Sequence, residues 1–311
     1  MAPKKIIEIS VIGKDKKGVI ATFTSILFDC GVNIEDLEQT VREDFFLMRI
    51  QGEVSGLSIS LSGLEDLLVA AGKKLDMEVN LNTRRSSGVK RIALLVTKEA
   101  HAPEAIISEI KAGRIQAEVA VMVGNREDLR YIAEREGIPF FCFNSRIKEE
   151  NEKNIIDLLR QSEYSVDLIV LARYMQILSP EFTFRYESQI INIHPSLLPA
   201  YPGARAYRQA YNNGATLAGA TAHFVTMDLD RGPIIYQEAF YIDKSCDTLQ
   251  DVVRRGQELE QRILARAVRM FIDEELYMHW GKVYWRKSPY CDDVCPEVAH
   301  RPYIAESSAP K

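Results

Sequence analysis

The chain has 311 residues, of which 46% are hydrophobic and 27% charged, and its formal net charge is −5 at pH 7. These values are ordinary for a globular protein of more than one domain, and they argue against the basic surface that nucleic-acid binding needs. No apolar run approaches the roughly 20 residues that span a bilayer. Residues 1–5 lead directly into strand-like sequence rather than a signal-peptide core. We therefore expect a cytoplasmic protein without nucleic-acid or membrane partners.

Residues 5–82 show two kinds of hydrophobic spacing. Alternating apolar side chains such as Ile9 and Val11 predict strands, and apolar side chains spaced like Val19 and Phe23 predict helices. The expected strands are 5–12, 33–41, 44–54 and 77–82, and the expected helices are 18–30, closed by Gly31 as a C-cap, and 61–75. This βαββαβ order predicts a ferredoxin-like sandwich of one antiparallel sheet and two helices.

Two glycine-containing connections mark this first region. Gly13-Lys-Asp15-Lys-Lys-Gly18 joins the first strand to the first helix, and Gly31-Val-Asn33-Ile joins that helix to the next strand. With the element order, these segments resemble an ACT domain, which implies a homo-oligomer (dimer or tetramer) that binds an amino-acid effector, with glycine and methionine as first candidates. The effector-binding residues would be Gly13, Asp15, Gly18 and Asn33. The alternative is a ferredoxin-like domain that serves only dimerisation.

The composition changes after residue 83. The segment 84–90 begins Arg-Arg-Ser-Ser-Gly and is typical of a linker. From there strands expected at 91–96, 118–123, 139–143, 166–172 and 189–193 alternate with helices at 102–112, 128–136, 148–162, from 179, and 248–271. The last helix is expected to begin with a capping box formed by Asp247 and Gln250.

This alternation predicts an open, mostly parallel α/β sheet. The expected organisation is a first domain at 1–83, a linker at 84–90, a second domain at 91–285 and an irregular C-terminal extension at 286–311. Ligands of such sheets bind outside the carboxyl ends of the strands.

Candidate catalytic groups lie at that edge. Asn192 and His194 end a predicted strand, and Asp230 follows in a Met-Asp-Leu-Asp-Arg-Gly-Pro segment. An amide that polarises a carbonyl, an imidazole that carries a proton and a carboxylate that orients the imidazole suffice for attack on a carbonyl carbon without a metal. The alternatives are a strand-end pair bonded to backbone and a simple turn aspartate. His223 is interpreted as a packed structural histidine, and Arg173 as either paired with a carboxylate or solvated at a strand end.

Three segments in this order, 171–180, 190–205 and 219–233, resemble the formyltetrahydrofolate deformylases. The resemblance implies a formyltransferase-type sheet and a place in one-carbon metabolism and purine biosynthesis. It also implies hydrolysis of 10-formyltetrahydrofolate, as substrate, to formate and tetrahydrofolate, with no cofactor or metal required. Asn192 would donate to the formyl oxygen, His194 would move a proton and Asp230 would orient it. The residues implied to bind the folate are Arg173, Tyr174, Met175, Ile177, Leu178, Thr226 and Leu229.

One position departs from the deformylase pattern. The deformylases usually carry a second histidine after the catalytic one, whereas this chain has Pro195, as in amine formyltransferases. Against a transferase acting on a phosphorylated amine, the loop 96–103 lacks the glycines of a phosphate nest and contains Glu99, which would repel phosphate. We interpret this loop, with His101, as a surface loop. The alternatives to hydrolysis are therefore formyl transfer to an amine and a non-catalytic folate- or amino-acid-sensing protein.

The five cysteines do not form the pattern of a secreted disulfide framework. Cys291, Cys295 and His300 could contribute to a metal site, but they lack a standard zinc spacing. A loosely packed tail with reduced thiols is favoured.

Overall fold

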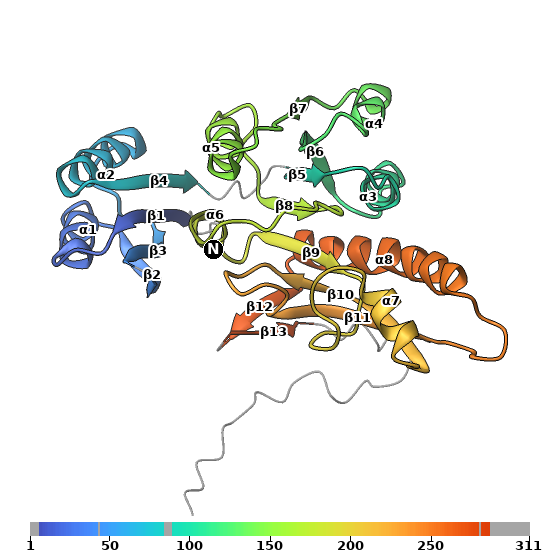
Figure 1. The fold of residues 1–311 in the computed structure, drawn as a ribbon. Coiled ribbons are helices and arrows are strands. Elements are labelled where there is room, and N and C mark those ends of the chain that lie inside the picture. The colour runs from blue at the N-terminus through green and yellow to red at the C-terminus, as the bar shows by residue number, and fades with distance from the viewer. Residues whose placement is uncertain (1–5, 43, 84–88, 280, 287–311) are drawn as a thin grey trace, which may run out of the picture. The chain divides into compact units, whose positions relative to one another are not determined.

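The computed structural model describes residues 6–42, 44–83, 89–279 and 281–286 (Figure 1). The chain divides into two compact units, one formed by Met1–Val89 and Ser179–Tyr186 and the other by Lys90–Leu178 and Glu187–Lys311. The linker residues 84–88 and the tail with Cys291, Cys295 and His300 lie outside the described residues. Among the described helices, none combines the length and the apolar character that crossing a bilayer would require.

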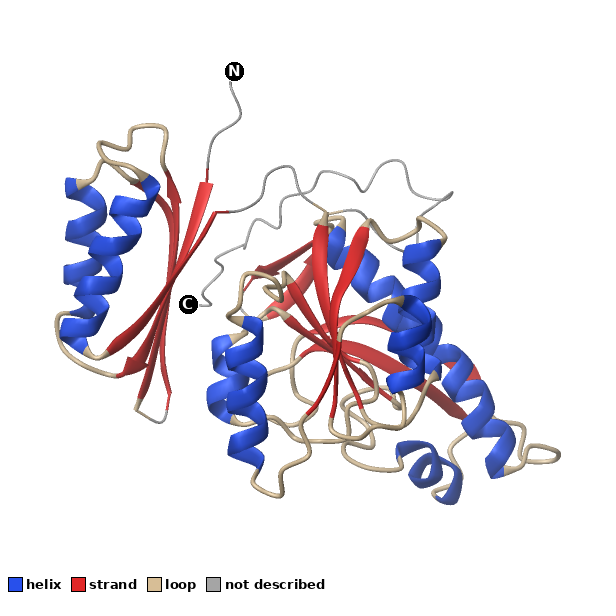
Figure 2. Ribbon diagram, turned by 90° about the horizontal axis from the view of Figure 1, so that it is seen from above, coloured by secondary structure: helices blue, strands red, loops and turns tan. Residues whose placement is uncertain are grey.

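The first unit is a four-stranded antiparallel sheet with strand order β2-β3-β1-β4. Its elements in chain order are β1 (Ile6–Lys14), α1 (Val19–Asp29), β2 (Asn33–Arg42), β3 (Phe45–Glu53), α2 (Leu61–Leu75) and β4 (Met77–Thr83). Figure 2 shows both helices on one face of this sheet. Ile9, Val11, Phe23 and Leu68 meet in the core between them. The predicted βαββαβ order is confirmed.

Two glycines differ from expectation in this unit. Gly13 lies inside β1, paired with Phe46 and Met77, because the strand continues to Lys14. The C-cap of α1 is Cys30, and Gly31 follows it with a φ of 77°. Gly31 is required there by space as well as by φ, since a Cβ would stand 2.4 Å from the carbonyl oxygen of Gly56.

A short helix from the middle of the chain belongs to the first unit. Helix α6 (Pro180–Arg185) begins where Ser179-Pro180 predicted it, and the Ser179 hydroxyl accepts from the N–H of Phe182. Phe184 packs with Ile12 and Leu47 of the N-terminal sheet. The first unit is therefore assembled from two separate stretches of sequence.

The second unit is a seven-stranded sheet with strand order β11-β10-β9-β8-β5-β6-β7. Its strands are β5 (Lys90–Val96), β6 (Ala117–Gly124), β7 (Phe140–Cys142), β8 (Leu168–Leu171), β9 (Ile190–His194), β10 (Leu217–Phe224) and β11 (Ile234–Tyr241). The pairs from β7 to β9 are parallel, and β10 and β11 are antiparallel. The predicted mostly parallel sheet is confirmed.

Helices lie on both sides of this sheet (Figure 2). They are α3 (His101–Lys111), α4 (Arg130–Glu136), α5 (Lys148–Leu159), α7 (Ala206–Asn212) and α8 (Leu249–Ile272), and a β12 (Leu276–His279)–β13 (Lys282–Trp285) hairpin follows. The capping box of α8 lies one residue later than expected, with Thr248 as N-cap and Asp251 at N3. Asp247 instead accepts from the N–H of Asp243, which turns the preceding loop.

The strand order places a topological switch point between β5 and β8. From β5 the chain moves through β6 and β7 to one edge, and then returns to build β8 and β9 on the other side. The loops that leave adjacent strands at such a point diverge and leave a crevice at their carboxyl ends. Asn192, His194 and Arg173 lie at or just after the carboxyl ends of these strands.

Candidate active site

The register between β9 and β10 decides which side chains meet at the sheet edge. Asn192 stands directly opposite His223, and His194 opposite Thr221. Opposite residues of an antiparallel pair project from the same face and lie close together. His194, Thr221 and His223 are all buried.

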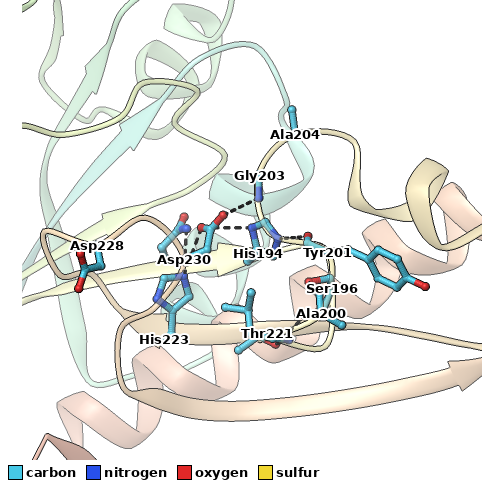
Figure 3. Close-up of polar contacts among 12 residues, drawn as sticks. His194, Ser196, Ala200, Tyr201, Gly203, Ala204, Thr221, His223, Asp228 and Asp230 are labelled. Carbon is cyan, nitrogen blue, oxygen red and sulfur yellow. Dashed lines mark hydrogen bonds and ion pairs between the residues drawn. The ribbon is translucent and has the colours of Figure 1, made fainter.

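Asp230 reaches the same place from the turn after β10 (Figure 3). Its Oδ1 lies 3.3 Å from Nδ1 of His194, and its Oδ2 accepts from the N–H of Gly203 at 2.8 Å. Burial raises the pKa of Asp230, but the hydrogen bonds from His194 and Gly203 outweigh it and hold the pKa below its ordinary value. Asp230 also has a φ of 54°, a left-handed conformation that costs a non-glycine residue about 1–2 kcal/mol.

His223 connects the amide to the carboxylate. Its Nδ1 donates to the carbonyl of Phe224 at 2.9 Å, and its Nε2 lies 3.3 Å from Nδ2 of Asn192 and 4.0 Å from Oδ1 of Asp230. Burial lowers the pKa of His223, so the neutral ring is favoured. A neutral ring that donates from Nδ1 must accept at Nε2, and therefore Asn192 presents its NH₂ group to it. The second N–H of this amide is left for another acceptor.

The loop after β9 encloses His194. Nε2 of His194 lies 3.0 Å from the carbonyl oxygen of Tyr201, which has a left-handed φ of 51°. A carbonyl and a carboxylate both accept, so the two ring nitrogens both face acceptors. Thr221 fixes this loop, since its hydroxyl donates to the carbonyl of Ser196 at 2.6 Å and accepts from the N–H of Leu198 at 3.1 Å.

The predicted folate-binding residues differ in their exposure. Met175, Ile177 and Leu229 are 55%, 61% and 51% exposed, which is unusual for large apolar side chains and leaves them available to a ligand. Thr226 is half-buried, and its hydroxyl donates to the carbonyl of Asp228. The other two apolar or aromatic members, Tyr174 and Leu178, are buried.

Arg173 lies in a cluster of charged side chains that the sequence did not predict. It contacts Glu99 at 3.5 Å and Glu260 at 3.6 Å, so it pairs with carboxylates rather than with solvent. His101 contacts the same two carboxylates, at 3.7 Å and 3.4 Å. The interpretation of 96–103 as a surface loop is therefore wrong: α3 begins at His101, and Glu99 and His101 turn toward a buried glutamate of α8.

The predicted effector residues lie in the first unit. Asp15 and Gly18 line an open pocket of about 600 Å³ together with Gln39 and Phe46. Asn33 starts β2 opposite Glu53, at the other end of the sheet, because the register runs from Asn33–Glu53 to the Arg42–Phe45 pair. Within one chain, Asn33 is therefore not brought together with Asp15 and Gly18.

Known families match both parts of the chain. The ACT domain profile matches residues 5–82, and the formyl transferase profile matches residues 90–268. The formyltetrahydrofolate deformylase of Bacillus subtilis is 38% identical over 273 residues, which cover 86% of this chain and 89% of that protein. The chain belongs to the formyltetrahydrofolate deformylase family. The Escherichia coli K12 deformylase is 36% identical, with 86% of this chain and 94% of that protein covered.

Solved structures agree with membership of the deformylase family. The formyltetrahydrofolate deformylase from Pseudomonas syringae has a TM-score of 0.61 at 28% identity, covering 91% of this chain and 95% of that one. A glycinamide ribonucleotide transformylase from Symbiobacterium toebii also has a TM-score of 0.61, at 33% identity, but covers only 66% of this chain. Deformylases are hydrolases, and this member has their ACT domain and their formyltransferase-type sheet.

The sequence named three of the four polar side chains that meet at the candidate site. His223 was treated as structural, and its burial agrees with that interpretation, but its contact with Asn192 was missed. The signal for this contact is the pairing of β10 with β9, which local hydrophobic periodicity does not reveal. Alternation places His223 on the same side of β10 as Thr221.

Proposed function

We propose that the chain hydrolyses 10-formyltetrahydrofolate to formate and tetrahydrofolate, with Asn192, His194 and Asp230 as the catalytic residues. The observation that carries this proposal is the orientation of the Asn192 amide. One N–H is used by His223, so the other is available to the formyl oxygen. That oxygen becomes an oxyanion when water attacks the formyl carbon, and a positioned donor stabilises the oxyanion by about 3 kcal/mol.

His194 would carry the proton in this reaction. The attacking water loses one proton, and N10 of the departing tetrahydrofolate gains one. His194 would accept the water proton and pass it to N10, while the Asp230 carboxylate and the Tyr201 carbonyl, which face its two ring nitrogens, orient the ring. Asp230, whose lowered pKa keeps it ionised, would balance the charge of the imidazolium and orient the ring.

The folate would lie against the exposed apolar side chains of Met175, Ile177 and Leu229. A pteridine or aminobenzoyl ring that covers them removes apolar surface from water, worth roughly 25 cal/mol per Å². Thr226 and Arg173 would contribute polar contacts at the rim, while Tyr174 and Leu178 would support the pocket from the core. No metal or further cofactor is part of the proposed mechanism.

The test is to incubate the pure protein with 10-formyltetrahydrofolate without any amine and to measure formate. Steady release of formate supports hydrolysis, and the Asn192→Ala variant is the matched blank for non-enzymatic deformylation. Turnover that begins only when an amine is added would make the chain a formyltransferase, the alternative favoured by Pro195. Binding of the folate without turnover in either assay would leave the non-catalytic sensing alternative.

The ACT domain suggests a small-molecule effector, and we propose an amino acid, glycine or methionine, bound between subunits of a homodimer or homotetramer. Asp15 and Gly18 lie at one end of the sheet and Asn33 at the other. A second copy of the sheet, paired in the opposite direction, brings Asn33 beside Asp15 and Gly18 across the subunit boundary. Gly13, inside β1, would act by keeping the end of the strand free of a side chain. The cytoplasmic location stays a prediction.

A further inference from the structure

Four charged or titratable side chains form a closed ring at the topological switch point of the larger sheet. Glu99 follows β5 and Arg173 follows β8, the two strands that flank the switch point. His101 and Glu260 complete the ring, and its four contacts measure 3.4–3.7 Å. We refer to Glu99, His101, Arg173 and Glu260 as the acidic ring. Its position is the place where open α/β sheets bind ligands.

The ring is half-buried, with Glu260 fully buried, and contains more carboxylates than permanent cations. Glu260 is 1% exposed, and the other side chains are between 14% and 24% exposed. Buried charges are costly unless paired, so the two carboxylates require a cation between them. Arg173 is the only permanent cation of the ring. It holds this place although its φ of 63° is a left-handed conformation that favours glycine. A strained residue kept beside a candidate site indicates a function for its side chain.

Hydrogen-bonding capacity around the ring is not fully used. Nε of Arg173 is buried and has no hydrogen-bond partner among the described residues, and the buried hydroxyl of Tyr207 lies beside Glu260. Tyr207 packs against Gly256 of α8, where a Cβ would stand 2.7 Å from its hydroxyl oxygen. The neighbouring Gln257 contacts Glu99 at 3.4 Å. The surroundings of the ring therefore offer both donors and acceptors to a small polar molecule, and Arg173 uses only some of them.

The acidic ring is next to the candidate catalytic groups. Leu171 of β8 pairs with Asn192 of β9, so the chain at Arg173 leaves the sheet level with His194, one strand away. Neighbouring strands are about 4.8 Å apart. An amine held by the two carboxylates of the ring would therefore lie beside the formyl group that Asn192 binds.

We propose that Arg173 is an internal cation that occupies an amine-binding site and thereby reserves the formyl group for water. This specificity role rests on the proposed hydrolysis. Glu99 and Glu260 provide the paired carboxylates that bind a primary amine or its ammonium form, and the Arg173 guanidinium fills the position between them. Without it, an amine nitrogen attacks the formyl carbon, the bond from that carbon to N10 breaks, and the amine proton passes through His194 to N10. The products are an N-formyl amine and tetrahydrofolate.

The experiment measures how the formyl group is partitioned. Wild type, Arg173→Gly and Arg173→Lys receive 10-formyltetrahydrofolate with millimolar glycinamide, and formate and N-formylglycinamide are quantified by mass spectrometry. Glycine suits the left-handed φ at this position, and lysine keeps the cation. The ratio of N-formylglycinamide to formate should rise at least about tenfold in Arg173→Gly, equal to 1.4 kcal/mol of relative barrier, and stay near the wild-type ratio in Arg173→Lys. The Arg173→Gly, Asn192→Ala double variant is the blank.

A second variant guards against a failure to fold. Arg173→Gly leaves Glu99 and Glu260 without a permanent cation between them. We therefore combine it with Glu260→Gln, which also removes the negative charge of the more buried carboxylate. It should still raise the ratio above wild type, by less than Arg173→Gly, because Glu99 remains. A folded variant of either kind with the wild-type ratio overturns the proposal, as does equal formyl transfer by Arg173→Lys. Absence of formate from the wild type would instead overturn the proposed hydrolysis itself.

Discussion

The amide of Asn192 and the ring of His223 face each other across β9 and β10, with 3.3 Å between Nδ2 and Nε2. The Phe224 carbonyl accepts a hydrogen bond from Nδ1–H of His223, which leaves Nε2 of the neutral ring able only to accept. His223 therefore fixes the orientation of the Asn192 amide toward the substrate, although His223 itself does not need to move a proton.

This contact predicts different effects for two substitutions of His223. Glutamine places an amide oxygen near the position of Nε2, whereas asparagine is too short to reach it. We expect His223→Asn to lower kcat about tenfold through a misaligned amide, with His223→Gln retaining most activity. Asn192→Ala should cost about a hundredfold or more, since the donor itself is lost. Steady-state formate release measures all three. Equal losses in His223→Asn and His223→Gln would argue against the orienting role.

Substitutions of Asp230 and of the nearby Asp228 test the role of the Asp230 carboxylate. Asp230→Asn keeps an oxygen for the Gly203 N–H but removes the negative charge beside His194. We expect kcat to fall roughly a hundredfold, with a smaller change in KM, because the charge acts mainly in the transition state. Asp228→Asn is the control, since Asp228 is exposed and points away from His194 in Figure 3. Near-normal kcat in Asp230→Asn would reduce Asp230 to a turn residue.

Acidification should destabilise the protein through His223. Burial lowers its pKa in the folded chain, while the unfolded histidine titrates near about 6.5. Below that pH the unfolded chain binds the extra proton, so stability is lost as the pH falls. Asp230, whose pKa is lowered in the folded chain, adds a similar loss of stability only as the pH falls below the pKa of an unfolded aspartate, about 4.

The measurement is the urea midpoint of unfolding between about pH 7.5 and about pH 5.5, a window that contains the histidine titration but not the aspartate one. The wild-type midpoint should fall over this window, and the fall should be smaller in His223→Gln, which has no titrating ring. The same fall in both proteins would assign the acid sensitivity to other groups.

Formate release should not depend on an added metal. The described residues contain no group of three or more His, Cys, Asp or Glu side chains arranged to hold a metal ion. The proposed mechanism uses the amide, imidazole and carboxylate alone. Dialysis against a chelator should therefore leave kcat unchanged, with a known zinc hydrolase treated alongside as the positive control. Loss of activity that zinc or another divalent ion restores would remove the metal-free mechanism.

The effector proposal predicts a response that spans two subunits. Glycine or methionine should bind the intact protein with measurable heat and change the rate of formate release. Asn33→Ala should weaken this response, and Asp29→Ala, on an exposed position of α1, should not. Point variants are preferable to deleting residues 1–86, because Phe184 packs on Ile12 and Leu47 and would lose that cover. Absence of any response to the twenty amino acids would leave the domain with assembly alone.

The sequence by itself determined the elements of the first unit and the parallel strands of the second. Periodicities of 2 and 3.6 are local properties, so the βαββαβ order and the strands β5 to β9 could be predicted from neighbouring residues. The position of Asn192 and His194 at a strand end is also local, and the carboxyl edge follows from the parallel sheet.

Only the tertiary structure decided which distant side chains share an environment. Asn192 meets His223 because β10 returns antiparallel in one particular register, and a one-residue slip would turn His223 to the other face. Glu260 meets Arg173 because α8 packs beside α3 and over strands β9 and β10, and α6 joins the first unit through Phe184. Such contacts depend on register, on packing and on the pairing of buried charges, which are set by residues far apart along the chain.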